Sequence, residues 1–509
     1  MINPPVFFGA GGFVLALIIF GGNWTDLANR IFTATLDFIT VHFGWYYVLI
    51  VSFFFFFVLW LYFSPYGKIK LGGTDSKPEF SRFAWFTMLF AAGMGMGLVF
   101  WGVAEPIMHY DNPPTAEPHS IQALKEGMRF SFFHWGFHPW AIYIIFGLGI
   151  AYFHFRHKLP LAPRSLLYPI IGERYKGWIG HVTDAFCTVG TLLGVATSLG
   201  LGAMQINSGF KELVGMSFSQ ENQITIIIII TLVATISTVS GVGRGIKYLS
   251  IINIVVMFAL LLFVFFAGPT LYQLKIFTTT FGDYVQHIID TSLWVDLRKG
   301  NSWQGTWTLF YWGWWISWCP FVGIFIARIS KGRTIREFVL YVFLIPTIVT
   351  FLWFSVFGGT AMNIELYGQG GIADVVNENV AMSLNALLVN LPLPAITQWV
   401  GLFLVIIFFI TSSDSGSLVD DMVTSGGHPN PPALQRVFWG FSEGAAAAVL
   451  LAAGGLNALR TASISAGLPQ SILLVIACFS LVKALRIDNK VEGIPEKEEL
   501  KKRQKKIKN

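Results

Sequence analysis

The sequence predicts an all-α polytopic membrane protein, because its composition is apolar and its apolar residues gather in long stretches. Of the 509 residues, 54% are hydrophobic and 12% are charged, whereas a soluble domain has about 25% charged residues. Stretches long enough to cross about 30 Å of hydrocarbon as a helix occur near 6–21, 46–63, 83–107, 130–153, 185–210, 223–240, 248–269, 306–327, 337–357, 395–414, 434–454 and 462–483. Their number predicts twelve transmembrane helices.

The first stretch is expected to remain in the protein, because no basic residue precedes it as a cleavable signal peptide requires. The connections between the stretches predict the orientation. Lys and Arg gather after the second, fourth, sixth and eighth spans, whereas the connection 358–394 contains neither. Basic connections face the cytoplasm. Both termini are therefore expected to be cytoplasmic, as an even number of spans requires.

Two spans contain residues that interrupt helices. Residues 91–97 of the third span read Ala-Ala-Gly-Met-Gly-Met-Gly, and each glycine lowers helix propensity by up to about 1 kcal/mol relative to alanine. The eighth span contains Gly313 and Pro320, which predict a second interruption. Close packing of ordinary helices is the alternative interpretation of the glycine run. A backbone freed from its helix in the membrane must line a cavity, because exposed amides cannot face lipid.

The two interruptions predict an internal repeat. They lie five spans apart, and an odd number of spans per unit reverses the orientation, so we expect two inverted five-helix repeats, spans 3–7 and 8–12, with a site between the broken helices. The expected segments are 1–82 with two peripheral helices, 83–270 with the first repeat, 271–305 as an outer loop, 306–484 with the second repeat, and 485–509 as a basic cytoplasmic tail. Residues 373–390 contain Asp374 and Glu378 and predict an amphipathic surface helix.

Four tryptophans lie within seven residues of the eighth span. They are Trp312, Trp314, Trp315 and Trp318. Indole rings attract cations without a hydrogen bond, and a quaternary ammonium, which has no N–H to donate, is the ligand that needs such rings. The fourth span adds Trp135, Trp140 and Tyr143, of which the last two share a helix face. These residues predict an ammonium-binding box that includes Trp315. A structural aromatic cluster is the alternative.

The tenth span ends in a polar run that begins with Thr411 and Ser412. Hydroxyls beside unwound carbonyls form the hard-oxygen site that sodium prefers. We therefore expect a sodium ion to be held by Thr411, Ser412 and the carbonyls of Ala91 and Met94. The alternative is that these hydroxyls bond only to carbonyls of their own helix.

Other polar residues are less informative. His134 and His138 are one turn apart and suit a metal ion, but no acid or cysteine nearby in the sequence completes a ligand set. Glu105 and Asp184 lie near predicted membrane boundaries and are expected to be hydrated, although acids at membrane depth are candidates for ion coupling. The net charge of +6 sits largely in the tail, so no nucleic-acid partner is expected. No nucleophile–base pair or phosphate loop stands out, so no enzyme activity and no cofactor are expected.

Together these motifs resemble those of the betaine/choline/carnitine transporter family of bacterial secondary transporters. The residues that carry the resemblance are the glycine run with Phe100–Pro106, Trp312–Trp318, and the segment 323–337 with Arg328, Gly332, Arg333 and Arg336. The resemblance implies twelve spans, an inverted-repeat core and a homotrimer in the bacterial cytoplasmic (inner) membrane. It also implies alternating access, in which sodium and a trimethylammonium compound are carried inward together.

The resemblance also implies roles for particular residues. The trimethylammonium group would lie among Trp135, Trp140, Tyr143 and Trp315, with Trp318 lower on the pathway. One sodium ion would lie at Ala91, Met94, Thr411 and Ser412. In some members a second sodium involves two threonines four residues apart in the fifth span, near a residue that matches Phe408. This chain has Thr191 and Val195 at the two positions, so one of the two hydroxyls that such a site uses is missing.

Substrate choice follows from the same resemblance. Choline-type members often carry an aspartate where this chain has Gly97, so a zwitterion such as glycine betaine is expected in preference to a cation. Carnitine exchangers depart from the glycine run that this chain keeps, which favours sodium-coupled symport over exchange. Choline, carnitine, trimethylamine, dimethylsulfoniopropionate and coupling to protons remain open. The short segments outside the spans predict weak or no osmotic activation. A receptor or pore that recognises an ammonium ligand is the remote alternative.

Overall fold

The computed structural model describes residues 2–93, 95–239, 243–298, 303–428 and 431–491, and in these residues the fold is helical. The first part of the chain forms α1 (Pro4–Asn23), α2 (Thr25–Phe63), α3 (Arg82–Gly93), α4 (Met96–Asp111), α5 (Ile121–Trp135), α6 (Phe137–His157), α7 (Tyr168–Ile171), α8 (Trp178–Val214), α9 (Gln220–Val239) and α10 (Gly243–Ala267). The second part forms α11 (Thr270–Gln286), α12 (Ile288–Leu293), α13 (Trp303–Thr306), α14 (Thr308–Ile329), α15 (Ile335–Trp353), α16 (Gly359–Tyr367), α17 (Ile372–Glu378), α18 (Ser383–Leu388), α19 (Pro394–Thr424) and α20 (Ala433–Val491).

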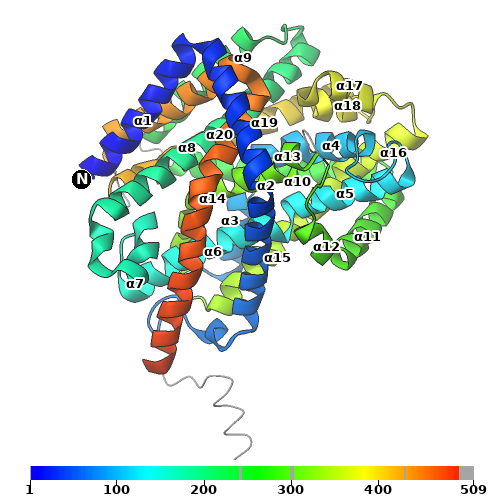
Figure 1. Ribbon diagram of the computed structural model, residues 1–509. Coiled ribbons are helices and arrows are strands. Elements are labelled where there is room, and N and C mark those ends of the chain that lie inside the picture. Colours follow the sequence, from blue (N-terminus) through cyan, green and yellow to red (C-terminus); the bar gives the residue numbers. More distant parts are fainter. Residues whose placement is uncertain (1, 94, 240–242, 299–302, 429–430, 492–509) are drawn as a thin grey trace, which may run out of the picture.

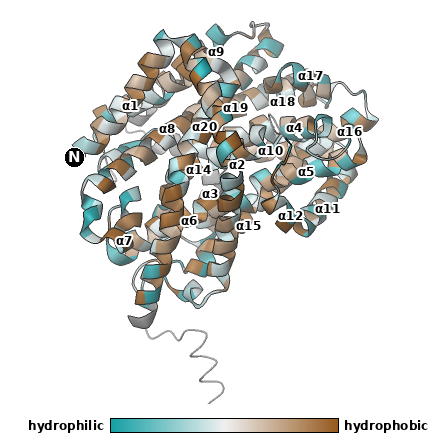
Figure 2. Cartoon of the chain, viewed as in Figure 1, coloured by the Kyte–Doolittle hydropathy of each residue, from teal (hydrophilic) through white to brown (hydrophobic). Residues whose placement is uncertain are grey.

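Long helices dominate the molecule, as Figure 1 shows. Among the described residues, nine helical stretches are long and apolar enough to cross a membrane. Their outer faces carry large apolar side chains such as Phe8, Phe63 and Phe266, each more than two-thirds exposed, and Figure 2 shows hydrophobic residues along the outer helices. An exposed apolar surface of this kind is suited to lipid. The prediction of a polytopic all-α membrane protein is confirmed.

The count of twelve spans stays a prediction. The predicted spans 434–454 and 462–483 both fall within α20, which bends where Gly454 and Gly455 leave helical torsion angles. The predicted third span is divided between α3 and α4, and the apolar part of α9 is shorter than the nine long stretches. The pseudo-symmetry of two five-helix repeats and the segment boundaries drawn from it likewise remain predictions.

The glycine run interrupts the third span, as expected. Helix α3 ends at Gly93 and α4 begins at Met96, with Gly95 extended between them (φ −149°, ψ −171°). A second break, which the sequence analysis did not predict, separates α5 from α6 at Gly136. A Cβ atom on Gly136 would lie 2.5 Å from the carbonyl oxygen of Phe132. Only glycine fits this bend, which directs the two halves of the fourth span.

The expected interruption of the eighth span is wrong, because α14 is helical from Thr308 to Ile329. Gly313 serves close packing instead: a Cβ atom there would lie 2.6 Å from the Cα of Ile464 in α20. The helix also continues through Pro320. Helix α14 packs against α6, α8 and α20, and such packing, rather than intrinsic propensity, supplies most of the stability of a helix in a protein.

Two regions between the predicted spans are largely helical. The segment expected as an outer loop, 271–305, lies mostly in α11, α12 and α13. Residues 373–390, expected as one surface helix, form two short α-helices and a single 3₁₀ turn. Leu387 and Leu388 are fully buried there, and the hydroxyl of Ser383 donates to the carbonyl oxygen of Phe100 in α4 at 3.3 Å. The segment therefore packs on α4. Most of the predicted basic tail lies outside the described residues.

Candidate functional site

Aromatic side chains from α5, α6 and α14 converge in the protein interior, and we call Trp135, Trp140, Tyr143, Tyr311, Trp314 and Trp315 the aromatic cluster. The ring centroids of Trp135 and Trp315 are 4.8 Å apart at 77°, those of Tyr143 and Trp315 are 6.2 Å apart at 80°, and those of Trp140 and Tyr143 are 5.3 Å apart. The four predicted box residues therefore form one continuous set of contacts. Their rings pack edge to face on one another, so a ligand among them requires the rings to separate.

Of the other tryptophans of α14, Trp314 belongs to this cluster, whereas Trp312 and Trp318 lie outside it. Trp312 stacks on His138, with centroids 5.8 Å apart, and meets Phe133 edge-on at 5.1 Å. Trp314 stacks on Trp315 at 5.1 Å, and its indole N–H donates to the carbonyl oxygen of Gly194 in α8 at 3.3 Å. Trp318 lies three residues beyond Trp315, on the same helical face. Helical geometry thus keeps Trp314 beside Trp315 and directs Trp312 and Trp318 to different surroundings.

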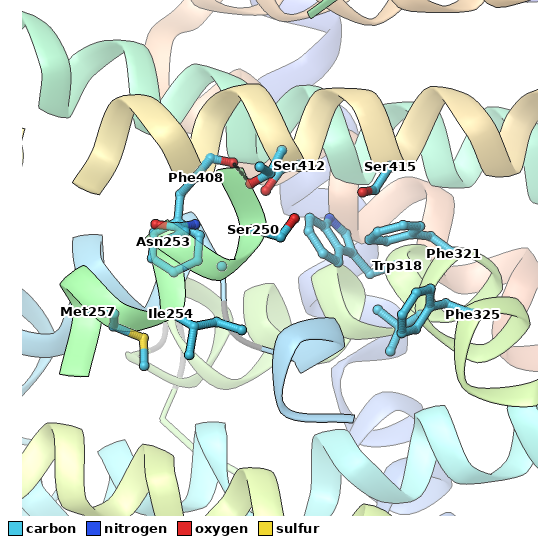
Figure 3. Close-up of a pocket in the computed structure, with 13 residues that line it drawn as sticks. Ser250, Asn253, Ile254, Met257, Trp318, Phe321, Phe325, Phe408, Ser412 and Ser415 are labelled. Atoms are coloured by element: carbon cyan, nitrogen blue, oxygen red, sulfur yellow. Dashed lines mark hydrogen bonds between the residues drawn. The ribbon is translucent and has the colours of Figure 1, made fainter. Parts of the chain in front are cut away.

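A cavity of about 130 Å³ lies beside Trp318, where α14 faces α10 and α19. Figure 3 shows the rings of Trp318, Phe321 and Phe408 around this space, with Ser250 and Asn253 of α10 among them. The full lining is Gly95, Ser250, Asn253, Ile254, Met257, Trp318, Phe321, Val322, Phe325, Phe408, Thr411, Ser412 and Ser415. The carbonyl oxygen of the buried Asn253 side chain has no hydrogen-bond partner among the described residues. Aromatic faces and polar groups therefore meet around one cavity.

The two hydroxyl residues predicted to bind sodium both line this cavity. Thr411 donates its hydroxyl proton to the carbonyl oxygen of Ile407 at 2.9 Å, which is the self-bonding that the sequence analysis left as an alternative. That bond uses the hydrogen and leaves oxygen lone pairs available. Of the predicted carbonyl ligands, Met94 lies outside the described residues, and Ala91 is described only as helical backbone of α3. Gly95, next to the break, lines the cavity.

The residues predicted for a second sodium lie on different helices. Phe408 of α19 lines the cavity. Thr191 of α8 is buried, and its hydroxyl has no hydrogen-bond partner in the part of the chain that the structure describes. Val195, one turn further along α8, packs close to Gly416 of α19 and offers no side-chain oxygen. The structure thus leaves one side-chain oxygen at this pair of positions.

Glu105 of α4 is fully buried beside the aromatic cluster, and the expectation that it is hydrated is wrong. Its Oε1 accepts from Nδ1 of His134 at 2.7 Å and from Nε2 of His109 at 3.3 Å. Its Oε2 accepts from the indole N–H of Trp135 at 2.8 Å and from the hydroxyl of Tyr311 at 2.5 Å. The sequence analysis missed this network, because its members come from three helices. The one available signal was an acid in an otherwise apolar span.

The metal interpretation of the two histidines changes with the structure. His138 turns away to Ser292, whose hydroxyl lies 2.8 Å from its Nε2, so the predicted pair separates. His134 instead joins Glu105 and His109, whose potential ligand atoms all lie within 4.8 Å of one another. The acid that the sequence seemed to lack is therefore present. Hydrogen-bond donors already occupy both of its oxygens, however, which weighs against a metal ion there.

Asp184, also expected to be hydrated, is fully buried in α8. Nε of Arg164 lies 2.9 Å from its Oδ2, and the backbone N–H of Arg164 donates to Oδ1 at 2.8 Å. The ion pair joins the first turns of α8 to the 3₁₀ turn Pro163–Leu167. Asp184 therefore has a structural role in this arrangement, and the prediction of its hydration is wrong.

Further buried acids lie at the end of α19 and on α20. Asp420, Asp421 and Glu443 are fully buried. Neither carboxylate oxygen of Asp420 or Asp421 has a hydrogen-bond partner among the described residues, and Glu443 accepts one hydrogen bond, from Ser417 at 2.9 Å. Nε of Arg436 lies 3.9 Å from Oδ2 of Asp421. The sequence analysis did not single out these residues, although Glu443 lies inside a predicted span.

Comparison with known proteins places these features in context. A family model described as betaine/carnitine/choline family transporter matches residues 5–490. The chain is 46% identical over 473 residues to the glycine betaine transporter OpuD of Bacillus subtilis, covering 92% of each chain. It is 42% identical to a glycine betaine transporter of Acinetobacter baylyi, covering 97% of this chain and 75% of that one. It is 40% identical to an ectoine/hydroxyectoine transporter of Virgibacillus pantothenticus, covering 95% and 97% respectively.

Proposed function

The chain belongs to the betaine/carnitine/choline transporter family, and from this premise we propose that it imports glycine betaine by sodium-coupled symport with alternating access. It is a transporter rather than an enzyme, as its relatives are. One observation carries the proposal: Trp315 of the aromatic cluster and Trp318 at the cavity lie three residues apart on α14, so the cluster and the cavity share one face of that helix. The solute would pass along this face.

The aromatic cluster and the cavity together match the two ends of glycine betaine. The trimethylammonium group has no proton to donate, and aromatic faces attract it by about 0.5–2 kcal/mol per ring. The carboxylate needs donors, which Ser250 and Asn253 supply from α10. A cavity of about 130 Å³ is smaller than the roughly 300–1,000 Å³ of pockets for drug-sized ligands. It suits a solute of a few heavy atoms.

We propose that sodium binds where Thr411 and Ser412 border the cavity. Hydroxyl oxygens next to the interrupted third span are the type of ligand that sodium prefers. The carbonyls of Ala91 and Met94 would complete the set. Entry of one sodium ion with a neutral zwitterion moves one charge inward, which the membrane potential favours by about 2.3 kcal/mol per 100 mV. A second sodium at Thr191 and Phe408 is proposed only as an alternative stoichiometry, because Val195 offers no oxygen.

The wider architecture is part of the same proposal. We propose twelve spans with two inverted five-helix repeats, 83–270 and 306–484, a homotrimer, and a bacterial cytoplasmic (inner) membrane with both termini inside. The break between α3 and α4 supports the first repeat, and the alternation of basic connections supports the orientation.

Other solutes are alternative substrates. Choline, carnitine and trimethylamine share the ammonium group that aromatic rings recognise. Ectoine is favoured by a separate observation, the 40% identity to a protein named as an ectoine/hydroxyectoine transporter. Proton coupling, exchange, and a receptor or pore are the remaining alternatives.

Uptake into proteoliposomes tests the proposal. Labelled glycine betaine is offered with and without an inward sodium gradient, and choline, carnitine, trimethylamine and ectoine are added as competitors. Accumulation above the outside concentration only with sodium, blocked most strongly by unlabelled glycine betaine, is the expected result. Exchange at the same rate without sodium would contradict symport. Stronger competition by ectoine would identify ectoine as the preferred substrate. Rapid ion flux without accumulation would indicate a pore.

A further inference from the structure

The fully buried Glu105 carboxylate lies beside the aromatic cluster. Four donors from α4, α5 and α14 surround it: His109, His134, Trp135 and Tyr311. A carboxylate accepts through both oxygens, whereas a protonated acid must donate through one of them. Because all four neighbours are placed to donate, the arrangement fits an ionised carboxylate.

The histidine tautomers agree with this assignment, which follows from the hydrogen-bond pattern. If Nδ1 of His134 donates to Glu105, the neutral ring presents Nε2 as an acceptor, and the hydroxyl of Thr308 lies 3.0 Å from it. His109 donates through Nε2. Both rings can therefore remain neutral, and the carboxylate keeps its charge with every lone pair directed at a donor.

The network ends in the aromatic cluster. Trp135 and Tyr311, which donate to the same oxygen of Glu105, both pack on Trp315, with ring centroids 4.8 Å and 6.0 Å from it. An indole that donates its N–H to an anion gains electron density in the ring, and a cation is attracted to that density. The charge itself also acts across a water-poor interior, where Coulomb interactions are stronger than in water. An uncharged ligand of the same shape gains neither effect.

We propose that Glu105 is a positioning residue whose charge makes the aromatic cluster select cationic headgroups: it fixes Trp135 and Tyr311 and biases binding toward a trimethylammonium group over a neutral group of the same shape. This inference rests on the proposed function, since it concerns recognition of the same solute. It differs from a packing role, which would support any ligand of that shape equally.

A pair of isosteres separates the two roles. In 3,3-dimethylbutanoate a carbon atom replaces the nitrogen of glycine betaine, so the shape and the carboxylate stay while the positive charge is lost. Binding of both compounds to the purified full-length protein is measured by calorimetry for the wild type, Glu105→Gln and the control Glu126→Gln. Glu126, on α5, is likewise a buried acid, but its carboxylate accepts hydrogen bonds from Thr115 and Ala116, outside the aromatic cluster.

Wild-type protein is expected to prefer glycine betaine. In Glu105→Gln the dissociation constant for glycine betaine should rise about tenfold more than that for the isostere, whose headgroup is neutral; Glu126→Gln should keep the wild-type ratio of the two constants. An equal loss of affinity for both ligands in Glu105→Gln would overturn the proposal and leave Glu105 a purely structural residue. An equal affinity of the wild type for both ligands would overturn it while the proposed function stands. Absence of binding by any trimethylammonium compound would overturn the proposed function itself.

A second variant covers the case in which Glu105→Gln does not fold. Glu105→Asp keeps the charge and retracts the carboxylate by one methylene. It should weaken the binding of both ligands by a similar factor and leave the ratio of their dissociation constants within about twofold of the wild-type ratio. A ratio that collapses although the charge is still present would contradict the assignment of selectivity to that charge.

Discussion

Glu105 and Asp420 are both fully buried carboxylates in apolar helices, yet their surroundings differ sharply. Glu105 accepts from four donors at 2.5–3.3 Å. Asp420 has no hydrogen-bond partner for either oxygen among the described residues, and the acids Glu443 and Asp421 are its electrostatic neighbours. Burial alone therefore does not define the role of an acid in this protein. The hydrogen-bond donors around an acid determine whether its buried charge is stabilised or destabilises the fold.

The difference has an energetic consequence. A buried charge is tolerated when hydrogen bonds replace the lost water, and it costs several kcal/mol when they do not. Glu105 is thus a rigid centre whose removal leaves four donors without an acceptor. Neutralising Asp420 should cost little stability, because no hydrogen-bond donor among the described residues uses its carboxylate as an acceptor. Substitutions in the two regions should therefore have opposite consequences.

The largest effect is expected for Glu105→Gln on stability. The amide can accept at one atom only, so its NH₂ group faces two donors, and we expect the free energy of unfolding to fall by about 3–5 kcal/mol. Thermal unfolding of the detergent-solubilised protein measures the change. A melting temperature equal to that of the wild type would remove the distinction between Glu105 and Asp420.

Trp315→Ala should have the next largest effect, on ligand binding. The ring contacts Trp135, Tyr143 and Trp314. Its loss should weaken the binding of glycine betaine roughly 30-fold, which corresponds to a desolvated cation–π contact of ~2 kcal/mol. Calorimetric titration is the readout. Trp178→Ala, at a tryptophan that is 73% exposed, is the control and should bind normally. Wild-type affinity in Trp315→Ala would exclude the aromatic cluster as the ammonium site.

Ser412→Ala tests whether the part of α19 that borders the cavity binds the coupling sodium ion. The residue lines the cavity, two turns before Asp420. Loss of one hydroxyl ligand should raise the sodium concentration for half-maximal uptake about tenfold, since a lost interaction of ~1.4 kcal/mol corresponds to that factor. Thr278→Ala, an exposed hydroxyl of α11 bonded to its own helix, is the matched control. Unchanged sodium dependence in Ser412→Ala would displace the proposed ion site.

The smallest effect is expected for Asp420→Asn. The amide has the same shape and removes a charge without compensating donors, so the free energy of unfolding should change by less than about 1 kcal/mol or increase. Sodium dependence of uptake should be retained. Glu443→Gln should fall between the two extremes, because its carboxylate accepts one hydrogen bond, from Ser417. Loss of sodium dependence in Asp420→Asn would move ion coupling to these acids.

Much of the architecture could be read from local patterns. Apolar stretches predicted the membrane class, and the glycine run predicted the break between α3 and α4. The same local reasoning failed at Gly313, because a glycine that breaks an isolated helix also permits the close contact with Ile464. Neither the sequence of α14 nor its propensity distinguishes these two uses. The distinction depends on which helix packs beside it.

By itself, the sequence determined the class of protein, its family resemblance and the aromatic residue types, because hydropathy and motif spacing are properties of neighbouring residues. Only the tertiary structure decided which of these side chains meet. Glu105 reaches His134 across 29 positions and Tyr311 across 206, and the helical twist moves Trp312 away from Trp315 to His138. Hydrogen bonding and burial depend on such distant partners. The aromatic cluster could therefore be anticipated, whereas the carboxylate that anchors it could not.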